Sequence, residues 1–183
     1  MEWLFSVLMI DVEESYMKRY LIEASVDTVA EKVSAHLEET IRLLAHLPED
    51  KADFAYAKGK WTVRQVVGHI LVAHRIFVTR AMCISRGETK SLPGFDEPVY
   101  AEGWPPENIG LKELATTYAY EALATLNWVR WMSVEELQRV GEANGIRLQP
   151  QHIFRALIGH ERHHLKMLCE TYGIPFPEHG KPM

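Results

Sequence analysis

The chain has little cysteine, no excess of basic residues and no long apolar run, and each shortage excludes a class of protein. Cys83 and Cys169 are its only cysteines, too few for a disulfide scaffold or an all-cysteine zinc site. No uninterrupted apolar run approaches the roughly 20 residues that cross a bilayer, so we expect no membrane partner. Its 20 Lys and Arg against 25 Asp and Glu give a net charge of -5, which argues against nonspecific binding to nucleic acid.

The sequence also lacks a phosphate-binding glycine loop and a recognisable secretory signal. Residues 3–10 are apolar, but the stretch is short and no positive charge precedes it. We therefore expect a cytoplasmic protein. Residues 1–20 are predicted to form an N-terminal arm or short helix, with Met17 as an alternative start to Met1, and residues 176–183 are predicted to form a C-terminal tail.

Four amphipathic segments and almost no strand pattern indicate an all-α fold. Apolar residues recur at helical spacing over residues 27–47, 63–84, 111–132 and 151–172. Asp27 and Thr62 are candidate N-caps, and Gly87 is a natural C-terminal cap. We predict that residues 21–175 form one four-helix bundle with a long loop between its second and third helices.

The segment Glu88–Gly110 loses all periodicity and is rich in proline and glycine, which predicts that long loop. Ordered loops of this length often wall a functional site, although this one could equally be a plain surface crossover. Its length also favours a topology other than simple up-down-up-down. Asp96 in this loop is a candidate catalytic residue, if it reaches the site.

The chain contains nine histidines, and two of them point toward the predicted core. With about 100° per residue, His164 lies about 40° from His160, and both fall on the apolar stripe of the fourth helix. His163 lies at the edge of that stripe. Buried imidazoles need partners, and two imidazoles one turn apart can bind one metal ion.

The second helix offers a third ligand, because His69 lies close to its apolar face. Three histidines leave one position for water or substrate, which is typical of a catalytic metal site. We therefore predict a metal site of His69, His160 and His164, with His163 and Glu161 as candidate supporting catalytic residues. His74 lies further round the second helix and could also face inward.

Residues 160–164 also satisfy the H-E-x-x-H pattern of zinc peptidases, in which Glu161 would be the general base. The extended form of that pattern fails, because Met167 and Glu170 occupy its later positions. A third ligand downstream would have to be Glu170, Glu178 or His179. Glu161 could equally lie behind the metal or on the surface.

Several motifs, taken in order along the chain, resemble those of the DinB superfamily and its YfiT-like branch. They are Lys60-Trp61-Thr62-Val63-Arg64-Gln65-Val66-Val67-Gly68-His69-Ile70, Leu92-Pro93-Gly94-Phe95-Asp96-Glu97, Ala143-Asn144-Gly145 and Gly159-His160-Glu161-Arg162-His163-His164-Leu165. The resemblance covers about residues 20–175. It implies a four-helix bundle of the DinB/YfiT type, often a homodimer, that holds zinc or nickel through His69, His160 and His164.

The resemblance also implies chemistry, since characterised relatives include transferases that use low-molecular-weight thiols such as bacillithiol. Relatives often carry acidic residues shortly after the second-helix histidine, whereas this chain has Ala73, His74 and Arg75 there. We predict a metalloenzyme that transfers a low-molecular-weight thiol to a small electrophile, or a metal-dependent hydrolase. The alternative is a non-enzymatic helical binding or dimerisation module with a structural or vestigial metal site.

Overall fold

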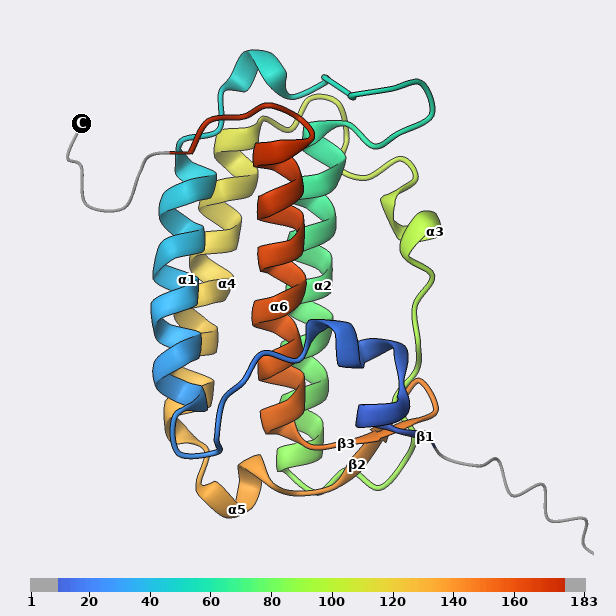
Figure 1. Ribbon diagram of the computed structural model, residues 1–183, viewed down its shortest axis with the longest axis vertical. Coiled ribbons are helices and arrows are strands. Elements are labelled where there is room, and N and C mark those ends of the chain that lie inside the picture. The colour runs from blue at the N-terminus through green and yellow to red at the C-terminus, as the bar shows by residue number, and fades with distance from the viewer. Residues whose placement is uncertain (1–9, 177–183) are drawn as a thin grey trace, which may run out of the picture.

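Four long helices form the body of the computed structural model, which describes residues 10–176 (Figure 1). They are α1 (Val29–Ala45), α2 (Val63–Ser85), α4 (Leu111–Trp131) and α6 (Pro150–Glu170). The prediction of an all-α four-helix bundle is confirmed. The shorter helices are η1 (Val12–Glu14), η2 (Tyr16–Tyr20), η3 (Glu49–Lys51), α3 (Glu97–Ala101) and α5 (Val134–Leu137).

Of the three helix termini predicted from local sequence, two are confirmed and one is wrong. Thr62 caps α2 in a capping box with Gln65, as its position before the apolar pattern predicts. Gly87 follows the end of α2 with a φ of 88°, a conformation that glycine adopts without steric cost. Asp27 is not the N-cap of α1, because that helix begins at Val29 and Thr28 takes the cap position.

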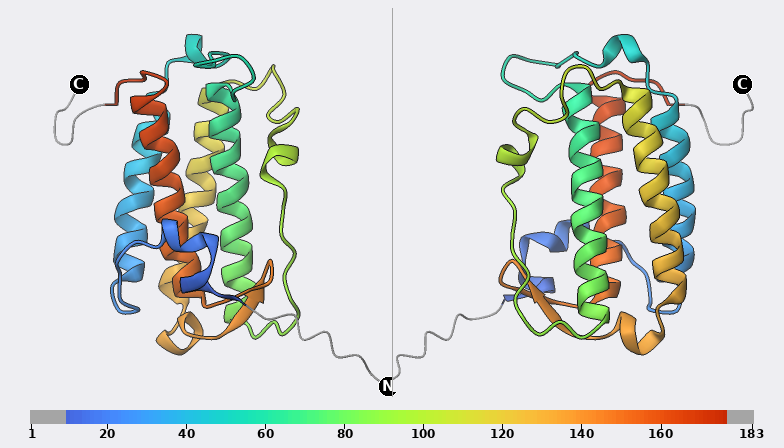
Figure 2. Two further views of the ribbon diagram at one scale, coloured as in Figure 1. Left: turned by 45° about the vertical axis from the view of Figure 1, so that its right-hand side comes forward. Right: turned by 180° about the vertical axis from the view of Figure 1, so that it is seen from behind.

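The order of the helices around the bundle is not their order along the chain. Helix α1 contacts α4 and α6, and α2 contacts the same two helices, so α1 and α2 lie on a diagonal. The chain runs upward in α1 and α6 and downward in α2 and α4 (Figures 1 and 2). The neighbours α2 and α4 are therefore parallel, and the departure from up-down-up-down topology is confirmed.

Parallel neighbours explain the length of the segment Glu88–Gly110. Helix α2 has 23 residues and is about 34 Å long, so the chain must return over that distance before α4 can begin. Figure 2 shows the segment running along the outside of α2 from one end of the bundle to the other, with α3 part of the way along. This segment is the predicted long loop, and it is a crossover.

A small sheet, which the sequence patterns did not predict, closes one end of the bundle. Strands β2 (Gly141–Ala143) and β3 (Ile146–Leu148) form an antiparallel hairpin, and β1 (Ile10–Asp11) pairs with β3 in parallel. Asn144 and Gly145 make the turn with positive φ angles of 54° and 72°, as two-residue hairpins require. The extended conformation considered for residues 147–149 is confirmed for Arg147 and Leu148.

The N-terminal residues that the structure describes pack on the bundle through η2. Gly159 of α6 faces the backbone carbonyl of Tyr20 so closely that no Cβ fits between them. Glycine at this position therefore lets η2 lie directly against α6. Residues 1–9 of the predicted arm and 177–183 of the predicted tail lie outside the described residues, so the boundaries of these two segments stay predictions.

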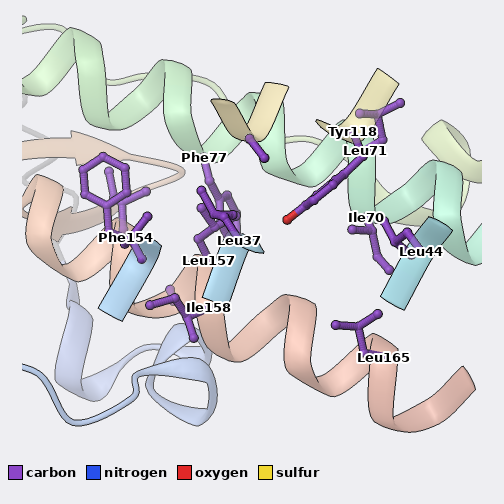
Figure 3. Close-up of a cluster of buried hydrophobic side chains, with 14 of the residues drawn as sticks. Leu37, Leu44, Ile70, Leu71, Phe77, Tyr118, Phe154, Leu157, Ile158 and Leu165 are labelled. Atoms are coloured by element: carbon purple, nitrogen blue, oxygen red, sulfur yellow. The ribbon is translucent and has the colours of Figure 1, made fainter. Parts of the chain in front are cut away.

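Helix α2 is long and apolar enough to cross a membrane by length and composition, although charged side chains interrupt its apolar residues. In its most apolar window, 61% of the window is buried inside the protein. The central core contains side chains from all four long helices, including Leu37, Ile70, Tyr118 and Leu157 (Figure 3). The composition of α2 is thus that expected of a core helix, which must be apolar on most of its surface.

Candidate metal centre

Three histidines from two helices converge in the interior of the bundle. His69 of α2 lies opposite His160 of α6, with 3.0 Å between their Nε2 atoms. His164, one turn further along α6, places its Nε2 atom 3.2 Å from that of His160. All three side chains are buried, and their ligand atoms lie within 4.8 Å of one another. The structure thus brings together the three residues predicted as metal ligands.

The spacing of these nitrogens fits a metal ion. Two ligands at the usual zinc–nitrogen distance in a tetrahedral site are about 3.3 Å apart, close to the two distances seen here. No fourth His, Cys, Asp or Glu of residues 10–176 belongs to the cluster. The donor set therefore leaves one position of a tetrahedral ion for a water molecule or a substrate.

Burial keeps the three imidazoles of the cluster in the neutral form, which is the form that binds a metal ion. It lowers the pKa of His69 to about 4 and the pKa of His160 to about 3. Burial and the charges of the neighbouring imidazoles lower the pKa of His164 to about 2. The three rings are therefore neutral at physiological pH, and each can present a lone pair to a metal without first releasing a proton.

The rings of His160 and His164 make no hydrogen bond through Nδ1 and lie among other aromatic rings. The Nδ1 atoms of His160 and His164 are buried and find no hydrogen-bond partner among the described residues, whereas metal-binding histidines usually donate from this nitrogen. Aromatic rings lie beside the cluster. Trp61 lies 5.0 Å from His69 and Phe77 lies 5.6 Å from His160, measured between ring centroids.

Tyr20 is a residue near the cluster that the sequence did not indicate. Its ring stands edge-on to His160 at 5.3 Å and to His163 at 6.0 Å, because η2 packs against α6 at Gly159. Burial raises the pKa of Tyr20, so the phenol keeps its proton near neutral pH. No local pattern could have placed it here, since the contact joins the N-terminal segment to the last helix.

Glu161 lies on the side of α6 that faces the bundle interior, at the centre of a hydrogen-bond network that joins all four long helices. It is fully buried. His36 of α1 donates from Nε2 at 2.8 Å, His74 of α2 donates from Nδ1 at 2.7 Å, and Tyr118 of α4 donates its hydroxyl at 2.6 Å. Figure 3 shows the Tyr118 hydroxyl pointing into the bundle interior.

This network changes the interpretation of two residues. The surface alternative for Glu161 is wrong, and three donors already occupy its carboxylate, which does not favour a role as general base. Burial alone would raise the pKa of Glu161, but the hydrogen bonds from His36 and His74 outweigh it and lower the pKa to about 2. His74 does face inward, as considered from the sequence, and its other nitrogen lies 2.8 Å from the Thr125 hydroxyl.

The other two catalytic candidates occupy different surroundings. His163 is exposed, and its ring lies 5.1 Å from that of His164, so it stands beside the cluster on the solvent side. Asp96 is also exposed, and its carboxylate accepts a hydrogen bond from the backbone N–H of Val99 at the start of α3. Asp96 is not part of the histidine cluster.

A cavity of about 310 Å³ reaches the cluster at His164. It lies between the C-terminal half of α6 and the segment that precedes α2, and it is lined by Tyr56, Gly59, Lys60, Trp61, His164, Met167 and Tyr172. Cavities of about 490 and 510 Å³ occur elsewhere, but none of the three histidines lines them. A search for the site by cavity volume alone would therefore have selected a cavity that none of the three histidines lines.

Of the two roles considered for Glu88–Gly110, the structure shows a crossover that approaches the cluster only beside His69. Trp104 and Pro105 lie against Gly68, the residue before His69, where an added Cβ would come within 2.5 Å of the proline ring. Glycine at position 68 thus allows the crossover to cover α2 beside a ligand. The cavity at His164, however, is lined by residues 56–61 and not by this crossover.

Comparison with known proteins supports the fold. Residues 32–168 match the family model of the DinB superfamily, which covers most of the chain. The structure of YfiT from Bacillus subtilis, described as a probable metal-dependent hydrolase with an unusual four-helix bundle topology, matches with a TM-score of 0.63. That match has 19% identity and covers 81% of this chain and 86% of YfiT. No curated protein matches the chain.

Proposed function

The chain belongs to the DinB superfamily, and from this premise we propose that it is a metal-dependent enzyme whose His69, His160 and His164 hold one divalent cation. The observation that carries the proposal is the convergence of three neutral imidazoles at metal-ligand spacing, with one position left open beside a cavity. Imidazole donors suit zinc and nickel, and these are the cations we propose.

The bound cation would supply a nucleophile near neutral pH by lowering the pKa of a water molecule or a thiol. With water the reaction is hydrolysis, as the description of YfiT suggests for that protein. With a low-molecular-weight thiol the reaction is transfer of the thiol to an electrophilic small molecule. The protein groups near the cluster serve both reactions equally, so the nucleophile must be found by experiment.

The surrounding residues contribute in three ways. Trp61 packs against the ring of His69, and Phe77 packs against the ring of His160. The ring of Tyr20 stands edge-on to His160 and burial keeps its phenol protonated, so Tyr20 is a candidate proton donor beside the cluster. The cavity of about 310 Å³ beside His164 matches a small-molecule substrate. We also propose, from the family resemblance alone, that the enzyme is a homodimer and is cytoplasmic.

Metal content tests the proposal. Untagged wild-type protein, His164→Ala and the control His46→Ala should be analysed by mass spectrometry after reconstitution with zinc or nickel. His46 is a fair control because it is exposed at the end of α1. We expect about one ion per chain in the wild type and the control, and none in His164→Ala. A wild-type protein that holds no metal would overturn the proposal.

Two further measurements assign the role of the metal. If His164→Ala keeps its far-ultraviolet circular dichroism while losing metal, the site is not structural; if it unfolds, the metal stabilises a non-enzymatic module instead. Titration of the metal-loaded protein with candidate low-molecular-weight thiols, bacillithiol among them, then separates the two reactions. Saturable binding supports thiol transfer, whereas its absence leaves hydrolysis.

A further inference from the structure

We propose that Arg80 anchors a second binding site, separate from the histidine cluster, for a small molecule that carries a carboxylate on an apolar body. The site lies between α2 and the first part of the crossover segment, where the side chains of Arg80, Ile76, Leu92, Phe95 and Tyr100 surround a cavity of about 220 Å³. This inference concerns neither the metal nor the reaction proposed above.

The first observation is a largely buried arginine without a counterion, whose unbonded nitrogens are not among the fully buried unpartnered atoms of the described chain. Arg80 is 6% exposed, yet it forms no ion pair with any carboxylate of residues 10–176. Its guanidinium donates one hydrogen bond, from Nη2 to the carbonyl of Pro93 at 2.7 Å, and lies 5.7 Å from the centre of the Phe95 ring. The remaining N–H groups of the guanidinium have no acceptor among the described residues.

Another arginine of the same helix shows what a purely structural arginine looks like in this protein. Arg64 is 7% exposed, almost as buried as Arg80. Its guanidinium is paired with the Asp53 carboxylate at 2.8 Å and also donates to the carbonyl of Ile109. Both arginines belong to α2 and donate a hydrogen bond to a loop carbonyl, but only Arg64 is also paired with a carboxylate of the described chain.

A bound anion would neutralise the unpaired positive charge of Arg80. A buried charge without a partner is costly, and an arginine remains protonated in proteins even though burial lowers the pKa of Arg80. A carboxylate is the best match, because its two oxygens can accept the paired N–H groups of a guanidinium. The other arginine at the cavity, Arg75, is already paired with Glu121 and is mostly exposed.

The second observation is the shape and chemistry of the cavity. Apart from the two arginines and Thr79, its walls are apolar and aromatic, and Phe95 and Tyr100 stand with ring centroids 5.4 Å apart. A volume of about 220 Å³ is below the roughly 300–1,000 Å³ of most drug-sized ligand sites, so the ligand is small. This cavity shares no lining residue with the cavity at His164.

The wall of the cavity is also fixed in place before any ligand binds. The backbone of Leu92 donates to the carbonyl of Glu142 and accepts from the N–H of Asn144, both at 2.9 Å. Gly94 lies so close to the Asn144 side chain that no Cβ fits there. The β2–β3 hairpin therefore holds the segment that carries Pro93 and Phe95, and the ligand need not order this segment on binding.

Calorimetric titration with 3-phenylpropionate tests the proposal, with the uncharged 3-phenylpropionamide as the matched probe. Because a carboxylate could also bind a metal, both titrations use the full-length protein with metal removed. We expect saturable binding of the acid and at least about tenfold weaker binding of the amide. Equal binding of acid and amide, or no saturable binding of the acid, would overturn the proposal.

Variants locate the binding. Arg80→Gln should weaken the acid at least about tenfold, whereas the control Arg86→Gln, which removes an exposed arginine paired with Glu136, should not. If Arg80→Gln fails to fold, Ile76→Trp fills the cavity with Arg80 in place and should abolish binding. If His164→Ala keeps the circular dichroism of the folded protein, it should bind the acid as the wild type does, because His164 does not line this cavity. Full affinity in both Arg80→Gln and Ile76→Trp would place the acid elsewhere and refute the site.

Discussion

Replacing Glu161 with alanine should destabilise the metal-free protein by about 4 kcal/mol, because its carboxylate accepts hydrogen bonds from donors on three other helices. The donors are His36, His74 and Tyr118, and each is at most 1% exposed. Water cannot replace the carboxylate at any of them without entering the core. The substitution therefore leaves three buried donors without their carboxylate partner, and the Thr40 hydroxyl, 3.3 Å from the Nε2 atom of His36, is a weaker substitute.

The magnitude follows from opposing contributions. Each orphaned buried donor costs about 1–3 kcal/mol, which gives up to about 9 kcal/mol for three. Removal of a fully buried carboxylate returns its desolvation energy, and thus breaking a buried ionic group typically costs about 3–5 kcal/mol in all. Glu161→Gln keeps the volume and one acceptor oxygen, so we expect about half the loss of the alanine variant.

Urea unfolding followed by far-ultraviolet circular dichroism measures these differences. Glu170→Ala is the matched control, since Glu170 is on the same helix but exposed, with Lys166 at 3.8 Å as its ion-pair partner. Its stability should change by less than about 0.5 kcal/mol. A Glu161→Ala variant within about 1 kcal/mol of the wild type would refute the reasoning, because water or rearranged partners would then be satisfying the three donors.

Three further expectations concern packing, pH and capping. Gly159→Ala should cost about 1–3 kcal/mol and displace η2, since its Cβ would collide with the Tyr20 carbonyl; unchanged urea stability would contradict that packing. In the metal-free protein the free energy of unfolding should fall by about 4 kcal/mol as the pH is lowered from about 7.5 to about 5.5. The reason is that the three cluster histidines have lowered pKa values and stay neutral in the folded protein, whereas in the unfolded chain they take up protons near pH 6.5. A flat pH profile in urea unfolding would show that the rings are not neutral by burial. Thr62→Ala should cost about 1 kcal/mol through loss of the α2 capping box, with Thr116→Ala on the exposed surface of α4 as the control.

The amino-acid sequence by itself determined the elements whose causes are local. Helical periodicity, the Thr62 cap and the Gly87 terminus depend on residues within a few positions of one another, so the four long helices follow from the pattern with small errors such as Asp27. The inward direction of His160 and His164 also follows from helix geometry alone. His69 needed only the further assumption that its helix packs against theirs.

Tertiary structure decided everything that depends on which surfaces meet. The parallel pairing of α2 with α4 is a property of helix packing and crossover, which periodicity does not encode. The position of Tyr20 over His160 arises from contact between the first and last segments of the chain. Glu161 shows the difference most clearly. Its angle on the helix left core and surface both open, and only the simultaneous approach of donors from α1, α2 and α4 makes a buried carboxylate energetically acceptable.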